Sequence, residues 1–195
     1  MIFEKKTLAS GSEVRLVADT EIESPADFLL GTIAYVKNRR ALGTSPVDFE
    51  EMDAIGSFIQ KGKLIGRPVF AYVHGGTTLS MEPFGDRFDS GRSGFIYCTA
   101  DKLKEFGLEK ADAEKAFQSD LDTMNQYLNN DVYGVEVHRK SVANNELELV
   151  ECFYGIYGIK NATEALNEHV LNEKAYELSE ATEKSFWEER DVVTV

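Results

Sequence analysis

The stretch from Ala111 to Tyr157, ADAEKAFQSDLDTMNQYLNNDVYGVEVHRKSVANNELELVECFYGIY, decides the fold class of this chain. At its start Phe117, Leu121 and Met124 recur at helical spacing, which predicts an amphipathic helix over 111–128. Further along, the strand-like runs 132–138 and 147–157 are separated by a short polar turn and predict an antiparallel pair. A helix that runs directly into a hairpin favours a mixed fold rather than a regular β–α repeat.

Strands and helices are interspersed in the same way along the rest of the chain. Residues 2–23 read as a hairpin with a turn at 9–12, and further strands are expected at 68–74, 77–81 and 93–99. Ser24-Pro25 and Ser45-Pro46 are each expected to begin a helix, because Ser caps helices and Pro fits the first helical position. A last helix is expected over 161–186. We therefore predict one α+β domain over 1–195, with a hairpin at 1–23, a core at 24–160, a mainly antiparallel sheet and several flanking helices, including a long C-terminal one.

The composition limits the function classes. The chain has 195 residues, with 34 acidic and 21 basic side chains and a net charge of −13. This charge argues against direct binding to nucleic acid and against docking on anionic lipid. No apolar run reaches the roughly 18–20 residues of a membrane span, and Met1–Lys6 does not resemble a signal peptide, so a cytoplasmic location is expected. Cys98 and Cys152 both lie in apolar strand-like runs and are expected to be buried free thiols.

The densest polar segment runs from His74 to Tyr97 and is the best place for chemistry. His74 with Asp86 or Asp89 could orient an imidazole as a base, or share a hard metal ion. Ser90 or Ser93 could then act as a nucleophile. A loop whose Asp and Ser side chains bind its own backbone explains the same residues, with Asp89 capping the turn and Gly91 taking a backbone angle that other residues resist.

Two other clusters have both a functional and a structural interpretation. Asp120, Asp122 and Asn125 fall on the predicted helix and could hold a divalent cation, although such residues more often form a solvated helix face. Phe153, Tyr154 and Tyr157 could stack on a base or pack beside their glycines. No P-loop, dinucleotide fingerprint or zinc motif occurs, and we predict neither a cofactor nor a bound metal.

Several blocks, in order, resemble an uncharacterised family of accessory proteins from bacteriophages, plasmids and conjugative elements. The blocks are Tyr72-Val73-His74-Gly75, Asp89-Ser90-Gly91, Asp131-Val132-Tyr133-Gly134 and Cys152 to Gly158. Arg87-Phe88 stands where that family has Pro-Trp, and Phe153 stands where it has Trp. The resemblance implies a small protein made in the cytoplasm of a bacterial host, and it leaves His74, Asp89, Ser90, Tyr127 and Asp131 as site candidates.

Two functions follow from these observations. The first is an acidic protein that binds and inhibits a host defence machine, of the anti-restriction or anti-CRISPR type, as a possible mimic of nucleic acid. Its partner would be a nucleic-acid-binding protein or nuclease, met through Tyr127, Asp131 and the helix acids Glu164, Glu168 and Glu180. The alternative is a small hydrolase of a nucleotide or signalling molecule, acting through His74, Asp89 and Ser90.

Overall fold

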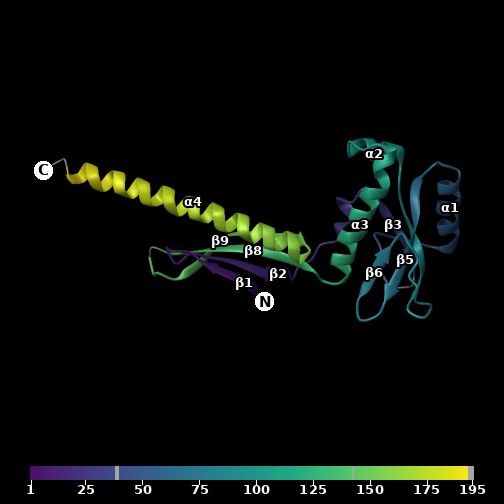
Figure 1. Ribbon diagram of the computed structural model, residues 1–195, viewed down its shortest axis with the longest axis horizontal. Coiled ribbons are helices and arrows are strands. Elements are labelled where there is room, and N and C mark those ends of the chain that lie inside the picture. The colour runs from purple at the N-terminus through teal and green to yellow at the C-terminus, as the bar shows by residue number, and fades with distance from the viewer. Residues whose placement is uncertain (38–39, 142, 193–195) are drawn as a thin grey trace. The chain divides into compact units, whose positions relative to one another are not determined.

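A computed structural model describes residues 1–37, 40–141 and 143–192, with the side chains of the last helix described as far as Glu183. Its contacts divide the chain into two compact units. The terminal unit comprises Met1–Glu21 and the chain from Val132 onwards, and the central unit comprises Ile22–Asp131. The predicted α+β class is confirmed (Figure 1). The single domain over 1–195 stays a prediction.

The central unit is built on a five-stranded sheet with the order β4-β3-β7-β5-β6. Neighbouring strands are antiparallel, except for the parallel pair β3–β4. The strands are β3 (Thr32–Val36), β4 (Ser45–Val47), β5 (Ile65–Val73), β6 (Thr77–Ser80) and β7 (Ser90–Cys98). The helices are α1 (Phe49–Gln60), α2 (Ala100–Glu105) and α3 (Ala113–Leu128), with short 3₁₀ turns at Pro25–Asp27 and Lys110–Asp112.

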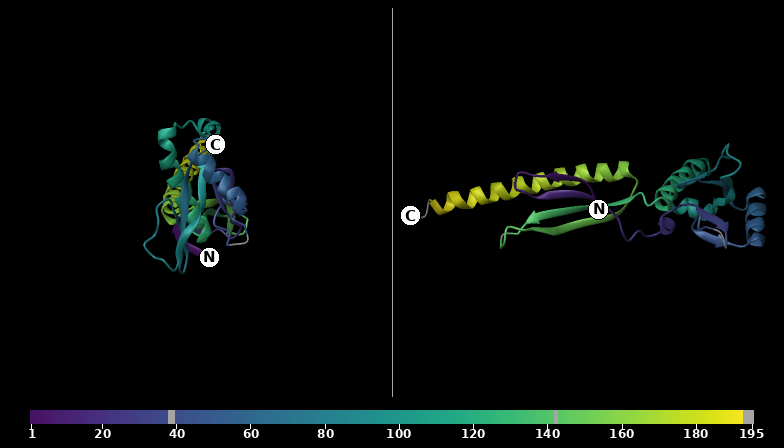
Figure 2. Two further views of the ribbon diagram at one scale, coloured as in Figure 1. Left: turned by 90° about the vertical axis from the view of Figure 1, so that its right-hand side faces the viewer. Right: turned by 90° about the horizontal axis from the view of Figure 1, so that it is seen from below.

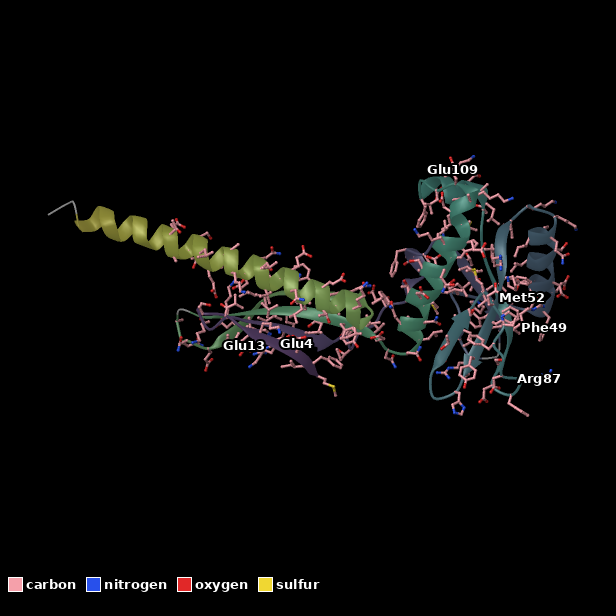
Figure 3. All side chains as sticks on the ribbon, in the orientation of Figure 1. Glu4, Glu13, Phe49, Met52, Arg87 and Glu109 are labelled. Atoms are coloured by element: carbon pink, nitrogen blue, oxygen red, sulfur yellow. The ribbon has the colours of Figure 1, made fainter. Side chains whose placement is uncertain are left out.

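Helices bury the apolar side chains on both faces of this sheet. On one face Phe117 and Leu121 of α3 pack in one core with Val69 and Ile96. On the other face α1 contributes Met52, which is 5% exposed, while Phe49 three residues earlier is 67% exposed (Figure 3). The predicted helix over 111–128 is thus confirmed, and its apolar stripe forms the larger core because it covers the middle of the sheet.

The two Ser-Pro signals do not begin regular helices. Ser24 caps only the 3₁₀ turn at Pro25–Asp27. Ser45–Val47 forms β4, and α1 begins instead at Asp48, whose side chain accepts from the Glu51 backbone while the Glu51 carboxylate accepts from the Asp48 backbone. The expectation that a helix begins at Ser45 was wrong, because Ser45 pairs with Ala34 in the sheet. The reciprocal capping box at Asp48 satisfies two backbone amides that would otherwise be free, and the helix therefore begins there.

The terminal unit has a four-stranded antiparallel sheet with the order β1-β2-β8-β9. Its strands are β1 (Ile2–Thr7), β2 (Glu13–Ala18), β8 (Val132–Lys140) and β9 (Leu147–Tyr157), followed by α4 (Ile159–Val192). The predicted hairpin and the antiparallel pair are therefore present, but the strands of the chain form two sheets rather than one. The C-terminal helix starts earlier and ends later than the predicted 161–186.

The α4 helix packs on one face of this sheet, across β2 and β8. Val14, Leu16, Val135 and Val137 meet Ala162 and Leu166 in a core whose members are nearly inaccessible to solvent. Figures 1 and 2 show α4 continuing past the end of the strands. The sheet thus has one covered and one uncovered face, and β9 lies at its margin.

The two cysteines have different environments. Cys98 is 2% exposed in the central core, as expected, and burial raises the pKa of its thiol. Cys152 is exposed, so the expectation was wrong for this residue. It pairs with Glu136 on the face of the sheet opposite α4, so the apolar character of that run does not indicate burial. Within the described residues, no helix has the length and hydropathy needed to cross a membrane.

Candidate functional site

The central unit brings His74 and Asp89 together. His74 follows β5 and Asp89 precedes β7, and the pairing of these strands sets Asp89 opposite Val73, the neighbour of His74. His74 Nδ1 lies 2.8 Å from Asp89 Oδ2. The side chains are 71% and 40% exposed, so the pair sits at the surface rather than in a water-excluded site. Through this contact the carboxylate can orient the imidazole ring.

Asp86, and not Asp89, caps the turn before β7. Its carboxylate accepts from the backbone N–H groups of Phe88, at 2.7 Å, and Asp89, at 2.9 Å. These bonds, first that of Asp89, hold the pKa of Asp86 below its usual value. Gly91 does not adopt a positive φ. The expectations for Asp89 and Gly91 were therefore wrong, because the cap lies three residues earlier than the sequence suggested.

A cavity of about 350 Å³ opens beside this turn (Figure 3 shows the loop at the label Arg87). Its lining comes from β3, β5, β7 and the loops next to them: Tyr35, Val36, Arg40, Leu42, Ala71, Val73 and Phe88 to Ser93. Asp89 and Ser90 line it, but His74 does not. The Ser90 hydroxyl donates to the Asp86 carbonyl, and the Ser93 hydroxyl donates to the Val69 carbonyl. The structure thus supplies an Asp–His pair and a cavity, but the hydrogen bonds of Ser90 and Ser93 are made to backbone carbonyls and not to the imidazole.

The acids of α3 do not form the solvated face that their spacing suggested. Asp120 is 8% exposed, and its carboxylate accepts from the Gly31 backbone at 2.7 Å and from the Leu30 backbone. Burial raises the pKa of Asp120 against the opposite effect of these bonds. Only Asp122 behaves as expected: it is exposed and accepts from Gln118. Asp120 therefore fastens α3 to the chain that leads into β3.

The C-terminal end of α3 carries two asparagine side chains whose role the sequence did not indicate. Asn125 and Asn129, one helical turn apart, each form two amide hydrogen bonds with β6: Asn125 with Leu79, and Asn129 with Thr77. Tyr127 is partly buried against the central core, and the Asp131 backbone N–H closes the helix end on Gln126. The side chains of Asn125 and Asn129 thus hold α3 to β6. Only the interval of four residues between the two Asn side chains could have indicated it.

The three predicted acids of α4 do not share one face. Glu164 and Glu168 are exposed and point away from the sheet side that Ala162 and Leu166 define. Glu180 falls two turns after Glu173, which is 3% exposed and forms two hydrogen bonds of 2.8 Å with Arg139. Glu180 therefore lies on the sheet side of the helix, where it accepts a hydrogen bond from Tyr176.

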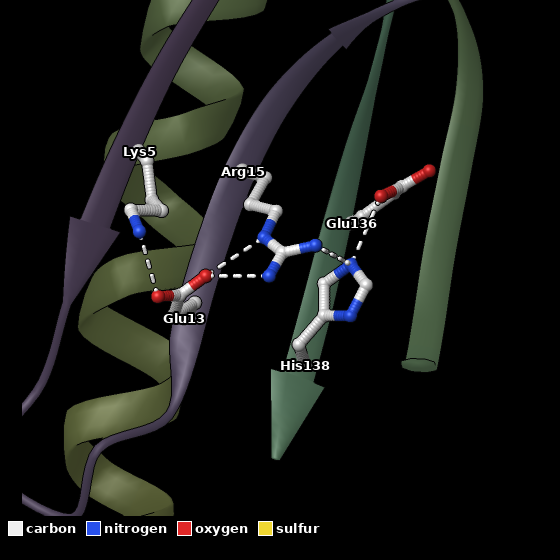
Figure 4. Close-up of polar contacts among 5 residues, drawn as sticks. All are labelled: Lys5, Glu13, Arg15, Glu136 and His138. Carbon is white, nitrogen blue, oxygen red and sulfur yellow. Dashed lines mark hydrogen bonds and ion pairs between the residues drawn. The ribbon is translucent and has the colours of Figure 1, made fainter. Parts of the chain in front are cut away.

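The uncovered face of the terminal sheet carries a row of charged side chains (Figure 4). Glu13 accepts from Lys5 at 2.8 Å and from Arg15 at 2.6 and 2.8 Å. His138 Nε2 lies 3.3 Å from Arg15 and 2.9 Å from Glu136. Arg15 can only donate a hydrogen bond and an ionised Glu136 can only accept one. His138 Nε2 can therefore form a hydrogen bond with only one of them at a time. The alternation of charge along β2 and β8 could have indicated the row, but not which strands lie together.

The row ends at β9, where the Tyr154 hydroxyl donates to Glu136 at 2.6 Å. This bond raises the pKa of Tyr154 to about 12, and it also lowers the pKa of Glu136. Basic and acidic side chains are mixed along the row, so this face is not an acidic patch. Of the residues described, no three His, Cys, Asp or Glu side chains come together as metal ligands would.

Comparison of the chain with protein-family models, with curated proteins and with solved structures gave no match.

Proposed function

We propose that the protein acts by binding, as an acidic inhibitor of a basic, nucleic-acid-binding protein of a bacterial host. The observation that carries this proposal is the outer face of α4. The helix has 34 residues, whereas the longest strand of the sheet has 11. These numbers correspond to lengths of about 51 Å and about 36 Å, so α4 is longer than the sheet on which it packs. The last hydrogen bond between α4 and the β1–β2 hairpin, within the described residues, joins Ser10 and Glu177.

The outer face of α4 has the pattern of a helix that meets a partner. Glu164, Glu168, Leu171, Ala175 and Leu178 follow one another at alternating intervals of four and three residues, and all are exposed. Leu171 and Leu178 are 65% and 69% exposed. An apolar stripe at this spacing is what a helix buries in a groove of another protein. The two glutamates at its start add a negative charge that a basic groove would attract.

The charge of the chain supports a basic partner. Residues 144–195 contain twelve acids and four bases, a net charge of −8 out of −13. Such a field accelerates association with a basic surface and weakens with salt, since the screening length falls from about 10 Å at 0.1 M to about 3 Å at 1 M. The resemblance to accessory proteins of phages and mobile elements favours a restriction or CRISPR nuclease as that partner.

The test is an interferometric binding series against purified restriction and CRISPR nucleases, combined with a DNA-cleavage assay. Glu164→Lys with Glu168→Lys should slow association and restore cleavage. Asp53→Lys with Glu105→Lys, two exposed acids of the central unit, makes the same change in net charge and should do neither. Leu171→Ala with Leu178→Ala should speed dissociation. Absence of binding to every basic nuclease would overturn the proposal, as would equal effects of the two charge reversals.

The cavity beside Asp89 favours a second candidate, a small hydrolase of a nucleotide or signalling molecule. Here His74, oriented by Asp89, would act as the base. The exposure of His74 and the hydrogen bond that occupies Ser90 make this the weaker candidate. A turnover assay against a panel of nucleotides decides the matter: this candidate requires hydrolysis that disappears in His74→Ala and persists in Glu164→Lys with Glu168→Lys.

A further inference from the structure

The outer edges of the two sheets are protected to different degrees. An exposed edge strand offers free backbone N–H and C=O groups, and proteins usually cover or shorten such edges. β4 has only three residues and contains Pro46. β6 is covered by the amide side chains of Asn125 and Asn129. β1 carries an irregularity between Ile2 and Glu4 and two lysines, Lys5 and Lys6.

The fourth edge, that of β9, is the exception. β9 is the longest strand, and no strand of the described residues pairs with its outer side. All its residues from Glu148 to Gly155 are exposed, because α4 lies mainly across β2 and β8 and meets β9 where His169 stacks on Phe153, with ring centroids 4.3 Å apart. Its final residues are engaged: the Tyr154 hydroxyl bonds Glu136, and the Gly155 N–H bonds Asp19. The open stretch is therefore 147–153.

The side chains of this open stretch define what it can accept. Glu148 pairs with Arg139 and Glu151 with Val137, and a register shift after Leu149 keeps both glutamates on the face that carries α4. Leu149 and Cys152 pair with His138 and Glu136 and so lie on the opposite face. From Glu146 to Tyr157 the chain has three acids and no base. A strand added to this edge would meet negative charge on one face and apolar groups on the other.

We propose that the outer edge of β9, over 147–153, binds an extended segment of a partner protein in which basic and apolar residues alternate. Backbone hydrogen bonds supply affinity in such strand addition, and the alternate side chains supply specificity. Lys or Arg side chains of the segment would lie beside Glu148 and Glu151, and its apolar side chains beside Leu149 and Cys152. This surface is separate from the outer face of α4 and depends on the proposed function only for the basic charge of the partner.

The test uses a dye-labelled octapeptide of alternating Lys and Val, with a Glu–Val octapeptide as its control, against the purified full chain. The Lys–Val peptide should bind in a fluorescence anisotropy titration, and the Glu–Val peptide should not. Hydrogen exchange should slow at the backbone amides of 147–153 in the complex. If the peptide slows hydrogen exchange only at amides outside 147–153, the proposal is overturned.

Two charge-reversed variants distinguish binding at the edge of β9 from nonspecific attraction between the basic peptide and the acidic chain. Glu148→Lys with Glu151→Lys should weaken binding of the Lys–Val peptide about tenfold or more, because like charges then face each other across the added strand. Asp53→Lys with Glu105→Lys should change it less than about twofold. Equal weakening by both variants overturns the proposal, and melting curves check that each variant is folded.

The competing occupant is a second copy of this chain paired edge to edge through β9. Sedimentation at increasing concentration should show monomer. A dimer that Glu148→Lys with Glu151→Lys dissociates would overturn the basic-segment proposal. Because these experiments contain no nuclease, their failure would leave the binding role of α4 intact, and a failure of nuclease binding would leave the peptide result intact.

Discussion

Asn129 and Thr77 are joined by two hydrogen bonds that imitate a neighbouring strand. Asn129 Oδ1 accepts from the Thr77 N–H at 2.9 Å, and its Nδ2 donates to the Thr77 carbonyl at 2.6 Å. Asn125 repeats this arrangement at Leu79. Two amide side chains on a helix therefore complete the edge of a sheet.

Removing this clamp should destabilise the central unit. Asn129→Ala leaves the partly buried Thr77 amide without its partner, and we expect a loss of about 1–3 kcal/mol in the free energy of unfolding. Asn129→Asp keeps the acceptor but sets a carboxylate against the Thr77 carbonyl, so it should be no better than Ala. Denaturant titration measures both. A stable Asn129→Asp variant would show that the donor half of the clamp contributes nothing.

A substitution at Thr77 should have the opposite effect on stability. The residue is 1% exposed, and its Oγ1 has no hydrogen-bond partner among the described residues. Thr77→Val removes a buried hydroxyl without leaving a hole, so the variant should be at least as stable as the wild type. Calorimetry should show an equal or higher melting temperature. A clear decrease would mean that the hydroxyl is bonded, for example to a buried water.

Asp120 should be the most sensitive acid of α3. Asp120→Ala leaves the backbone amides of Gly31 and Leu30 unsatisfied and should cost about 1–3 kcal/mol. Asp120→Asn keeps one acceptor oxygen in the same place and should lose less. Asp122→Ala, on the exposed side of the same helix, should change the unfolding free energy by under about 0.5 kcal/mol. An equal loss for Asp120→Ala and Asp122→Ala in urea titrations would contradict this role.

The turn at Asp86 should depend on pH. The pKa of this carboxyl is lower in the folded protein than its ordinary value of 3.8, so its stabilisation is present above pH 3.8 and disappears as the pH falls through the lower, folded value. Asp86→Asn can still cap the turn but does not titrate. The difference in melting temperature between wild type and this variant should therefore shrink in acid. A difference that stays constant would show that the charge of Asp86 is unimportant.

Tyr154 should titrate later than an ordinary tyrosine. Its pKa of about 12 exceeds the ordinary value of 10.0 because the hydroxyl donates to Glu136. The stabilisation from this bond is therefore complete below pH 10 and is lost as the pH rises through about 12. The difference in tyrosinate absorbance between wild type and Tyr154→Phe isolates this group. A midpoint near 10 in that difference would contradict the bond.

Local patterns predicted the elements of this fold better than their arrangement. The helix over 111–128 and the pair at 132–138 and 147–157 follow from spacing alone, and the structure has α3 at Ala113–Leu128 and β8 beside β9. The division into two sheets could not be predicted, because Glu13 pairs with His138 across the whole central unit. Periodicity identifies which residues form a strand but does not identify a partner that far along the chain.

The candidate site shows the same limit. Strand pairing sets His74 beside Asp89, as the polar segment suggested, because β5 and β7 are neighbours in the sheet and the Val73 N–H donates to the Asp89 carbonyl. The sequence could not indicate that Ser90 bonds the Asp86 carbonyl instead of approaching the imidazole. The burial of Asp120 and the exposure of Cys152 were also hidden, since both depend on which region of a sheet a helix covers.

The pairing of β2 with β8 also sets an order of events during synthesis. The ribosome releases β1 and β2 first, then every residue of the central unit, and β8 only afterwards. The β1–β2 hairpin is therefore made before β8 and α4, against which it packs. The central unit, in contrast, already has all of its own strands and helices at that stage. Domains generally fold as units while the chain is being made. Folding of the nascent central unit shortens the distance between Glu21 and Val132, and so lowers the entropy lost when β2 finally meets β8.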